Sequence, residues 1–383
     1  LYATPYEASG PDVDVITPIL ISPAQAAGEI KIGVITSTSG PLASYGVAYN
    51  EGLTWGLNYY TGGKMAINGK KLVVTSKDDG ADPASATASF KEMVGNGTKV
   101  IVGTASSGVA LTLAPLAAQN KVLYISGPAK NDAVTSSANR YVFRSGNSST
   151  QDLAPLANIK PISGKKVVLF VEDNAFGAGN IAAARALMTS KGALFEEIKV
   201  PTSTSDFTPF AKKAADAKGA YIFIAWSNAL TAGAMLTSLK VQGAFAKQRP
   251  ITGLAGAATY DIYGTLFDGT NAILTNSYFA GASNSGAAND LATWYANNKK
   301  TQDLFTSTGA DSAKMIVQAL KGNTAQNVDT MIANLEGYSW VGVKGLMTVS
   351  KSTHLLIQPM FLVGLTKTDK GYVPVLQLSL IHI

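Results

Sequence analysis

The sequence predicts an α/β fold with two doubly wound lobes, each built on a largely parallel sheet. Apolar runs of strand length alternate with helical stretches over Glu29–Ser126, which indicates βαβ units. The same alternation starts again over Lys165–Gly256, after the extended run Tyr141–Thr150. Beyond Ala272 extended segments and helices are mixed, so we expect several crossings between the lobes rather than a single linker.

The elements of the first lobe are short apolar runs bounded by charged or turn residues, each followed by a helical stretch. Asp82 and Pro83 are the residue types expected at the N-cap and the first position of a helix. The predicted strands are Glu29–Thr36, Lys71–Asp79, Lys99–Gly103 and Lys121–Ser126, and the predicted helices are Tyr45–Tyr60, one that starts at Asp82-Pro83, and Ser107–Gln119.

The second lobe repeats this order. Its first strand, Lys165–Asp173, is an apolar run bounded by charge, as expected of a strand buried on both faces. The predicted strands are Lys165–Asp173, Leu194–Val200, Ala220–Trp226 and Arg249–Gly256, and the predicted helices are Gly177–Lys191, Asp206–Ala217 and Ala229–Val241.

These patterns set the expected domain limits. We assign residues 29–145 and 276–350 to the first lobe, and residues 146–275 and 351–377 to the second. Residues 1–28 are expected to be a leader, because Ile16–Val34 passes from a short apolar piece into Ala24-Gln25-Ala26, spaced as at a secretory cleavage site. Residues 378–383, LSLIHI, match the translation of a sequencing adapter, so we expect a non-native tail and give His382 no role.

Composition excludes several classes of function. The 383 residues contain no Cys, which excludes disulfides, thiol catalysis and Cys-ligated metals. The net charge of +6 is spread over single and paired Lys and Arg residues, so we expect no nucleic-acid partner. No apolar run reaches the ~18 residues of a membrane span. We predict neither a metal site nor a cofactor.

Gly103–Gly108, GTASSG, joins a strand to a helix and poses the main chemical question. A nucleophile elbow has the pattern G-x-S-x-G, which this stretch misses by one residue. A serine nucleophile also needs a base, and His354 is the one credible candidate. No phosphate-binding loop pattern is present either. We therefore predict a binding loop and no enzyme activity.

Ligands of open α/β sheets bind in the crevice at the carboxyl ends of the strands. The segments expected there carry hydroxyl, small and aromatic side chains, with Lys130 as the one charge. Helices that start at Ser107 and near Gly177 would present free N–H groups to an anion. The segments are Thr36–Tyr45, Thr104–Gly108, Gly127–Asn131, Asn174–Gly177, Trp226–Asn228 and Leu254–Ala257.

Three longer stretches that contain some of these segments carry a resemblance to a known family: IKIGVITSTSGPLASYG, IVGTASSGVALTLAP and FVEDNAFGAG, in that order along the chain. Over about Glu29–Val375 the chain resembles the type I periplasmic solute-binding proteins, the leucine/isoleucine/valine-binding branch of ABC importers. The resemblance implies two Rossmann-like lobes joined by about three crossings, a periplasmic binding protein-like I fold that closes on its ligand. It implies ligand contacts from Tyr45, Ser106, Ser107, Pro128, Ala129, Lys130, Phe176, Trp226, Ser227, Asn228, Ala255 and Gly256.

Two departures from the family pattern bear on the ligand. Amino-acid binders carry an acid near the position of Ala255, which holds the α-ammonium, and Thr at the position of Lys130. A buried ammonium without a partner costs several kcal/mol or so, so we expect an anionic or neutral ligand. The alternative is that Lys130 points to solvent and that another residue supplies the negative charge.

The expected function is therefore that of an exported receptor, periplasmic or on the cell surface. It would close on a small ligand that is amino acid-like, an amide or a carboxylate, with aromatic compounds among the options. It would then deliver this ligand to an ABC permease and ATPase complex. The alternative is a ligand sensor of the same fold, of the amide or urea type, that signals to a regulator. We expect a monomer.

Overall fold

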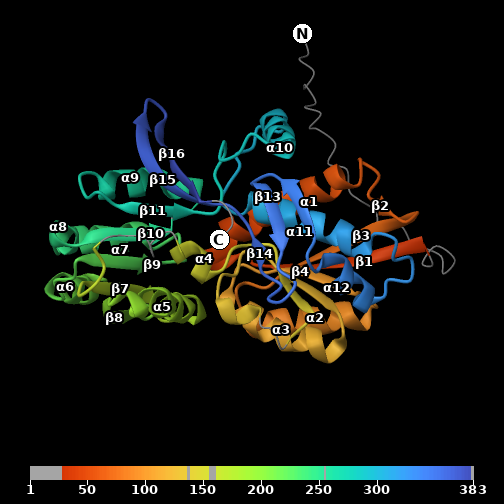
Figure 1. Cartoon of the computed structure of the whole chain (residues 1–383), viewed down its shortest axis with the longest axis horizontal. Coiled ribbons are helices and arrows are strands. Elements are labelled where there is room, and N and C mark those ends of the chain that lie inside the picture. Colours follow the sequence, from red (N-terminus) through yellow and green to blue (C-terminus); the bar gives the residue numbers. More distant parts are fainter. Residues whose placement is uncertain (1–27, 136–138, 155–160, 254–255, 381–383) are drawn as a thin grey trace, which may run out of the picture.

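The computed structural model describes residues 28–135, 139–154, 161–253 and 256–380. The predicted leader, apart from its last residue, and the final three residues of the predicted tail lie outside these ranges. Two sheets divide the molecule into two lobes that lie side by side (Figure 1). We call the lobe with the six-stranded sheet lobe 1 and the lobe with the seven-stranded sheet lobe 2.

The sheet of lobe 1 has the order β2-β3-β1-β4-β5-β6, and all its pairings are parallel except that of β2 with β3. Its side chains alternate between two helical layers. Ile30, Ile32 and Val34 pack against α1, α11 and α12, whereas Ile35 packs against α2 and α3. The strands are β1 Glu29–Thr36, β2 Ala66–Ile67, β3 Lys70–Asp78, β4 Val100–Gly103, β5 Leu123–Ser126 and β6 Val142–Arg144, and the helices are α1 Ala43–Tyr60, α2 Pro83–Gly95, α3 Ser107–Asn120, α11 Thr306–Leu320 and α12 Val328–Leu335.

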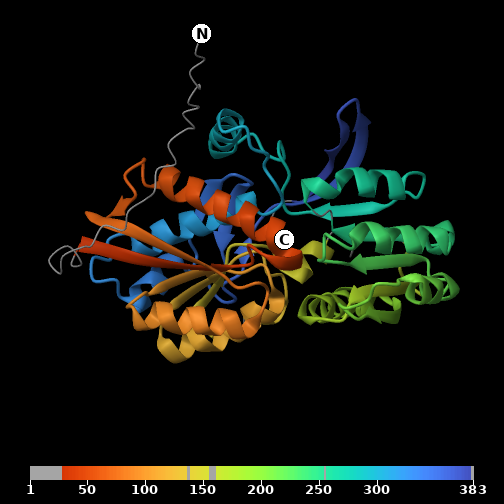
Figure 2. The same cartoon turned by 180° about the vertical axis from the view of Figure 1, so that it is seen from behind.

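The helices α1 and α11, which lie on one side of the sheet, opposite α2 and α3 (Figure 2), approach each other closely because glycine faces backbone on both. A Cβ at Gly52 would lie 1.9 Å from the carbonyl oxygen of Thr306, and one at Gly309 would lie 2.0 Å from that of Tyr49. No other residue type fits either position without a shift of the backbone. The contact fixes α11, and with it Phe305, beside the cleft.

Lobe 2 has the sheet order β16-β15-β11-β10-β9-β7-β8, with two antiparallel strands at one edge. Val167, Leu169 and Val171 of β7 pack against α5, and the alternate residues Val168 and Phe170 pack against α6, α7 and α9. The strands are β7 Lys166–Glu172, β8 Leu194–Val200, β9 Tyr221–Ala225, β10 Arg249–Gly253, β11 Ile273–Asn276, β15 Met360–Thr368 and β16 Gly371–Leu380, and the helices are α5 Ala175–Met188, α6 Thr208–Asp216, α7 Ala232–Val241, α8 Ala244–Lys247 and α9 Tyr260–Phe267.

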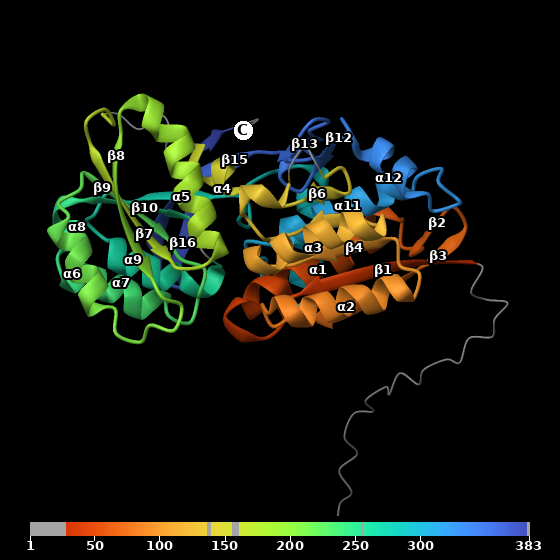
Figure 3. The ribbon, with the colours of Figure 1, turned by 90° about the horizontal axis from the view of Figure 1, so that it is seen from below.

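The described chain passes between the lobes after β6, after β11 and after β14. Helix α4 (Ser149–Leu153) lies on the first crossing, and α10 (Gly286–Asn297) follows the second. Seen from below, α4 and the start of β15 lie between the lobes (Figure 3). The small sheet of β12 (Ser339–Gly342), β13 (Gly345–Val349) and β14 (Leu356–Ile357) completes lobe 1.

The predicted fold class is confirmed, and one predicted limit is corrected. Because β14 pairs with β13, the chain leaves lobe 1 for the last time after Ile357 rather than after residue 350. β11 likewise pairs with β10, so the second crossing starts after Asn276. Leu378, the first residue of the predicted tail, pairs with Leu362 in the sheet of lobe 2.

Candidate functional site

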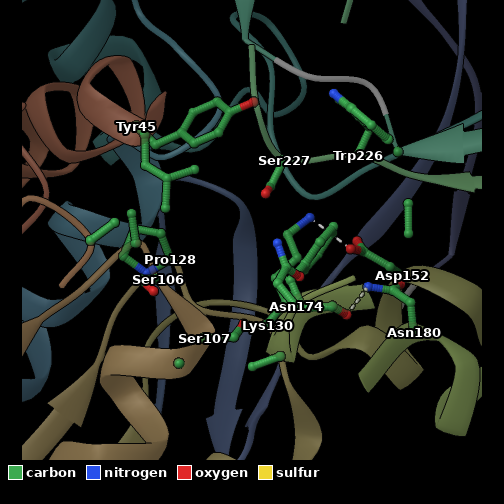
Figure 4. A pocket seen from close by; sticks show the side chains of 18 of the residues that line it. Tyr45, Ser106, Ser107, Pro128, Lys130, Asp152, Asn174, Asn180, Trp226 and Ser227 are labelled. Carbon is green, nitrogen blue, oxygen red and sulfur yellow. Dashed lines mark hydrogen bonds and ion pairs between the residues drawn. The ribbon is translucent and has the colours of Figure 1, made fainter. Parts of the chain in front are cut away.

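A cavity of about 280 Å3 lies between the lobes, where the parallel strands of both sheets end. Its walls are mainly apolar, with a few polar side chains, as is usual for small-molecule sites. The lining residues include Tyr45, Ser106, Ser107, Pro128 and Lys130 from lobe 1, Asp152 from the first crossing, Asn174, Phe176, Asn180, Trp226 and Ser227 from lobe 2, and Leu304 and Phe305 ahead of α11. Figure 4 shows Tyr45, Ser106 and Pro128 on one side of the cavity and Trp226 and Ser227 on the other.

The loop after β4 forms the polar wall of lobe 1. It turns at Gly103, whose φ is +117° and where a Cβ would lie 1.9 Å from the carbonyl oxygen of Ile35, so only glycine fits. The Thr104 hydroxyl donates a short hydrogen bond to the buried carboxylate of Asp79. Asp79 also accepts hydrogen bonds from the Ser37 hydroxyl at 2.6 Å and from the Ala81 N–H at 2.8 Å. This buried carboxylate therefore fixes the conformation of the loop.

Both serines of this loop use their oxygens as acceptors. Ser106 is the N-cap of α3, and its Oγ lies 3.4 Å from the Val109 nitrogen, which donates to it. The Ser107 Oγ accepts from the backbone N–H of Asn131 at 3.3 Å. Each hydroxyl keeps its own hydrogen to donate. With the N-terminus of α3 beside them, they form a group of donors suited to an oxygen-rich or anionic end of a ligand.

Aromatic rings form the apolar walls. The rings of Tyr45 and Phe305 meet edge to face, with centroids 5.2 Å apart. Burial raises the pKa of the Tyr45 hydroxyl far above its ordinary value, so this side chain is neutral at physiological pH. From lobe 2, Phe176 lines the cavity together with Trp226, whose ring packs edge to face on Phe207 with centroids 5.5 Å apart. Aromatic rings from both lobes therefore face the cavity.

The end of β7 carries Glu172, a buried acid that organises the lobe 2 wall. Its Oε1 accepts from the Asn228 N–H at 3.0 Å, and its Oε2 accepts from the N–H and the hydroxyl of Ser227. The side-chain amide of Asn174 donates to the same Oε2 at 3.2 Å, while its Oδ1 caps α5 by accepting from the Gly177 N–H at 2.9 Å. Glu172 thus positions both strand-end loops without lining the cavity itself.

Lys130 and Asp152 form an ion pair on the cavity wall, marked by a dashed line in Figure 4. Nζ and Oδ2 are 2.6 Å apart, and the side chains are only 12% and 10% exposed. The Nδ2 of Asn147 donates to the other oxygen of Asp152 at 2.6 Å. Burial raises the pKa of the Asp152 carboxyl, and the Lys130 ammonium opposes that shift. The ammonium also lies 5.8 Å from the centroid of the Phe305 ring.

The pair corrects one expectation. Lys130 was predicted to be the one charge in the cleft, but Asp152 lies beside it on the wall. Lys130 also does not point to solvent, as the alternative supposed, and the acid beside it is paired with its ammonium. Sequence reasoning missed this acid because α4 lies on a crossing segment, outside the strand ends that were searched.

The other predicted site residues fall into three groups. Eight of them line the cavity: Tyr45, Ser106, Ser107, Pro128, Lys130, Phe176, Trp226 and Ser227. Ala129, Asn228 and Gly256 are not among the lining residues: the carbonyl of Ala129 accepts from the buried Arg144, the N–H of Asn228 binds Glu172, and Gly256 packs against Asp303. Ala255 lies outside the described residues. The role of each in ligand binding stays a prediction.

His354 has a structural role in lobe 1. Its ring stacks on Phe143 with centroids 3.9 Å apart, and its nitrogens are hydrogen-bonded to the Val142 carbonyl and to Glu336. It is not among the residues that line the cavity. Within the described ranges, no group of three or more His, Asp or Glu side chains is arranged to hold a metal ion, and no helix combines the length and apolarity needed to cross a membrane.

A family model for periplasmic binding proteins matches residues 29–371. The chain belongs to the periplasmic binding protein family. A relative in Brucella melitensis, the Leu/Ile/Val-binding protein homolog 3, is 26% identical over 354 residues, which cover 90% of this chain and 93% of the relative. The Leu/Ile/Val-binding protein BraC3 of Rhizobium johnstonii is 28% identical over 169 residues, 44% of this chain and 46% of the relative.

Two solved structures illustrate that the fold is shared with known proteins. An ABC-type branched-chain amino acid transporter protein from Rhodopseudomonas palustris has a TM-score of 0.77 and 28% identity, with 92% of this chain and 97% of that chain covered. A solute-binding protein from the HaA2 strain of that organism, solved with p-hydroxybenzoic acid, has a TM-score of 0.81 with 92% and 97% covered. Because its identity to this chain is 20%, the likeness concerns the fold alone. The descriptions of the Brucella relative and of the structure with 28% identity favour the receptor over the sensor alternative.

Proposed function

We propose that this protein is an exported receptor that closes its two lobes on one small, largely apolar molecule and delivers it to an ABC importer. The observation that carries the proposal is the cavity between the lobes, with hydroxyl donors and a helix N-terminus on one wall and aromatic rings on the others. The chain provides groups that hold a ligand, and the family and its solved neighbours are solute-binding receptors.

The polar end of the ligand binds at the start of α3. The Ser106 and Ser107 hydroxyls and the N-terminal N–H groups of the helix donate to it, since both serine oxygens already accept from the backbone. Its apolar part lies between the Tyr45–Phe305 pair and the rings of Phe176 and Trp226. Ligand that bridges both lobes stabilises the closed arrangement, which is the form that an importer is expected to recognise.

A thermal-shift screen of the full chain tests this function. The panel contains branched-chain amino acids, amides, urea, and aliphatic and aromatic carboxylates. A ligand at 100 times its Kd adds roughly 2.7 kcal/mol to the free energy of unfolding, which is readily measured. We expect at least one compound of the panel to raise the melting temperature at micromolar concentration. No shift from any of them would contradict the proposal.

Uptake then separates a transport receptor from any other small-molecule binder. Cells of the native host with the coding sequence disrupted are expected to lose uptake of the compound found in the screen, and the intact protein is expected in the extracytoplasmic fraction. Normal uptake in the disrupted strain would contradict delivery to an importer.

A further inference from the structure

In the part of the chain that the structure describes, Lys130 and Asp152 are the charged side chains of the cavity wall. They differ in how much of their hydrogen-bonding capacity the protein uses. Asp152 has both oxygens engaged, Oδ2 by Lys130 and Oδ1 by the amide of Asn147. An ammonium has three N–H donors, and Asp152 takes one of those of Lys130. The wall therefore offers spare N–H donors to a ligand, while each of its carboxylate oxygens already accepts one hydrogen bond.

Glu172 and Asp303, two other acids near the cavity, also accept hydrogen bonds from the protein, and neither is among the lining residues. Glu172 accepts from two backbone N–H groups, a hydroxyl and an amide. The Oδ1 of Asp303 accepts from the N–H groups of Ala257 and Leu304 at 2.8 and 2.7 Å. Within the described residues, Asp152 is the one acid that lines the cavity. The carboxylate that a ligand ammonium would meet in the cavity is therefore one whose charge Lys130 already balances.

The loop that carries Lys130 is tied to the start of α3, and both line the same cavity. The backbone N–H of Asn131, the residue after Lys130, donates to the Ser107 hydroxyl oxygen at 3.3 Å. The carbonyl of Lys130 in turn accepts from the N–H of Ser149 at 2.7 Å, which ties this loop to α4. The fully buried guanidinium of Arg144 holds the loop from behind through the carbonyls of Ala129 and Asn131. The backbone of this loop is therefore held from three sides, and Asp152 holds the ammonium at its end.

From this geometry we infer that Lys130 and Asp152 together select ligands by charge, and that the natural ligand is an organic monocarboxylate without an amino group. One carboxylate oxygen binds the serine hydroxyls and the N-terminus of α3, and the other binds Lys130, which stays bonded to Asp152. Asp152 holds the ammonium at the cavity wall and repels a second negative charge. The inference rests on the proposed function and specifies its ligand class.

Two matched pairs of probes test the inference by isothermal titration calorimetry of the full chain at pH 7. 4-Methylpentanoate and L-leucine differ only by the α-ammonium, and benzoate and benzamide differ by the negative charge. For the wild type we expect 4-methylpentanoate to bind at least tenfold more tightly than L-leucine, and benzoate at least tenfold more tightly than benzamide. Tighter binding of L-leucine than of 4-methylpentanoate would overturn the inference and leave the receptor function intact. No binding of any of the four would overturn the inference alone, because the proposed function fails only if no compound of the whole thermal-shift panel binds.

Two variants assign the selectivity to the pair. Lys130→Met keeps the length of the side chain and leaves Asp152 without its cation, so carboxylate affinity should fall at least tenfold and the preference over L-leucine should shrink. Asp152→Asn keeps Lys130 charged, so carboxylate affinity should hold or rise, and this variant keeps the test open if Lys130→Met unfolds. Lys212→Met, which removes an exposed i,i+4 pair with Asp216, is the matched control and should change nothing. Unchanged selectivity in a folded Lys130→Met protein, or loss of carboxylate binding in Asp152→Asn, would overturn the assignment.

Discussion

Asp303 of lobe 1 accepts a hydrogen bond across the cleft from the backbone N–H of Ala257 in lobe 2, with 2.8 Å between the nitrogen and Oδ1. A second bond joins the lobes elsewhere along the cleft, where the Nδ2 of Asn131 donates to the Ala175 carbonyl at 2.6 Å. The loop after β10, which carries no acid of its own in its described part, thus meets one supplied by the opposite lobe. Both bonds exist only when the lobes are together.

Asp303→Ala should therefore favour the open arrangement. A hydrogen bond to a charged group contributes about 1.5–3 kcal/mol, so ligand affinity should fall roughly tenfold or more. Small-angle X-ray scattering should show a larger radius of gyration with subsaturating ligand. Asp329→Ala is the control, because it removes an acid whose partner, Arg140, is exposed on lobe 1. Equal affinities of the wild type and Asp303→Ala would show that this bond does not stabilise closure.

Ser106→Ala and Ser107→Ala should differ in their effect on stability. Both remove a donor to the ligand, so each should weaken carboxylate binding about tenfold. Ser106 is also the N-cap of α3, so its loss should lower the free energy of unfolding by about 1 kcal/mol. Titration calorimetry and urea unfolding measure the two effects. Full carboxylate affinity in either variant would exclude that hydroxyl from the site.

Phe176→Ala tests the apolar wall of lobe 2. The half-buried ring lines the cavity, and its removal should weaken binding of benzoate by about tenfold through lost apolar contact. Phe195→Ala is the matched control, because that half-buried ring lies on β8 under Arg185, outside the cavity lining. Calorimetry that finds equal losses in both variants would mean that the effect arises from general destabilisation.

The buried pair of Lys344 and Asp311 in lobe 1 should matter for stability rather than for binding. Nζ and Oδ2 are 3.0 Å apart, both side chains are fully buried, and Lys344 also donates to Gln358 at the last crossing. Lys344→Met strands a buried carboxylate and should cost about 3–5 kcal/mol in urea unfolding at pH 7. Lys344→Met combined with Asp311→Leu should recover most of that loss. A double variant as unstable as the single one would contradict the electrostatic explanation.

The same pair gives a pH dependence with a definite sign. Burial raises the pKa of Asp311 to about 6 from an ordinary value of 3.8, and the Lys344 ammonium opposes the shift. Between these values the folded state binds more protons than the unfolded state, so stability falls as pH rises from about 4 to 6, by on the order of 3 kcal/mol. Urea unfolding should show this slope in the difference between the free energies of unfolding of the wild type and the double variant. A difference that is flat over this range, or that rises, would contradict the shift.

The fold was largely predictable because local signals agree with it. Asp82 is the predicted N-cap of α2, and its side chain accepts from the Ser85 N–H at 2.8 Å. The apolar strands bounded by charge are likewise recognisable from a few neighbouring residues. The last limit of lobe 1 was not predictable, because β14 has only two residues and is defined by its pairing with β13.

The site was predictable only where strand ends supply it. Ser107 and Trp226 follow parallel strands, so the topology alone places them at the crevice. Asp152, Phe305 and Asp303 reach the site from a crossing helix and from the turn before α11. No periodicity or motif marks them, since their positions depend on how the two lobes pack.

A crystal structure of the full chain grown with the tightest-binding carboxylate of the panel tests the central claim most directly. The account predicts the ligand enclosed between the lobes, with its carboxylate within hydrogen-bonding distance of Ser106, Ser107 and the ammonium of Lys130, and with Lys130 still paired with Asp152. A ligand bound outside this cavity, or one whose carboxylate lies away from the start of α3, would contradict it.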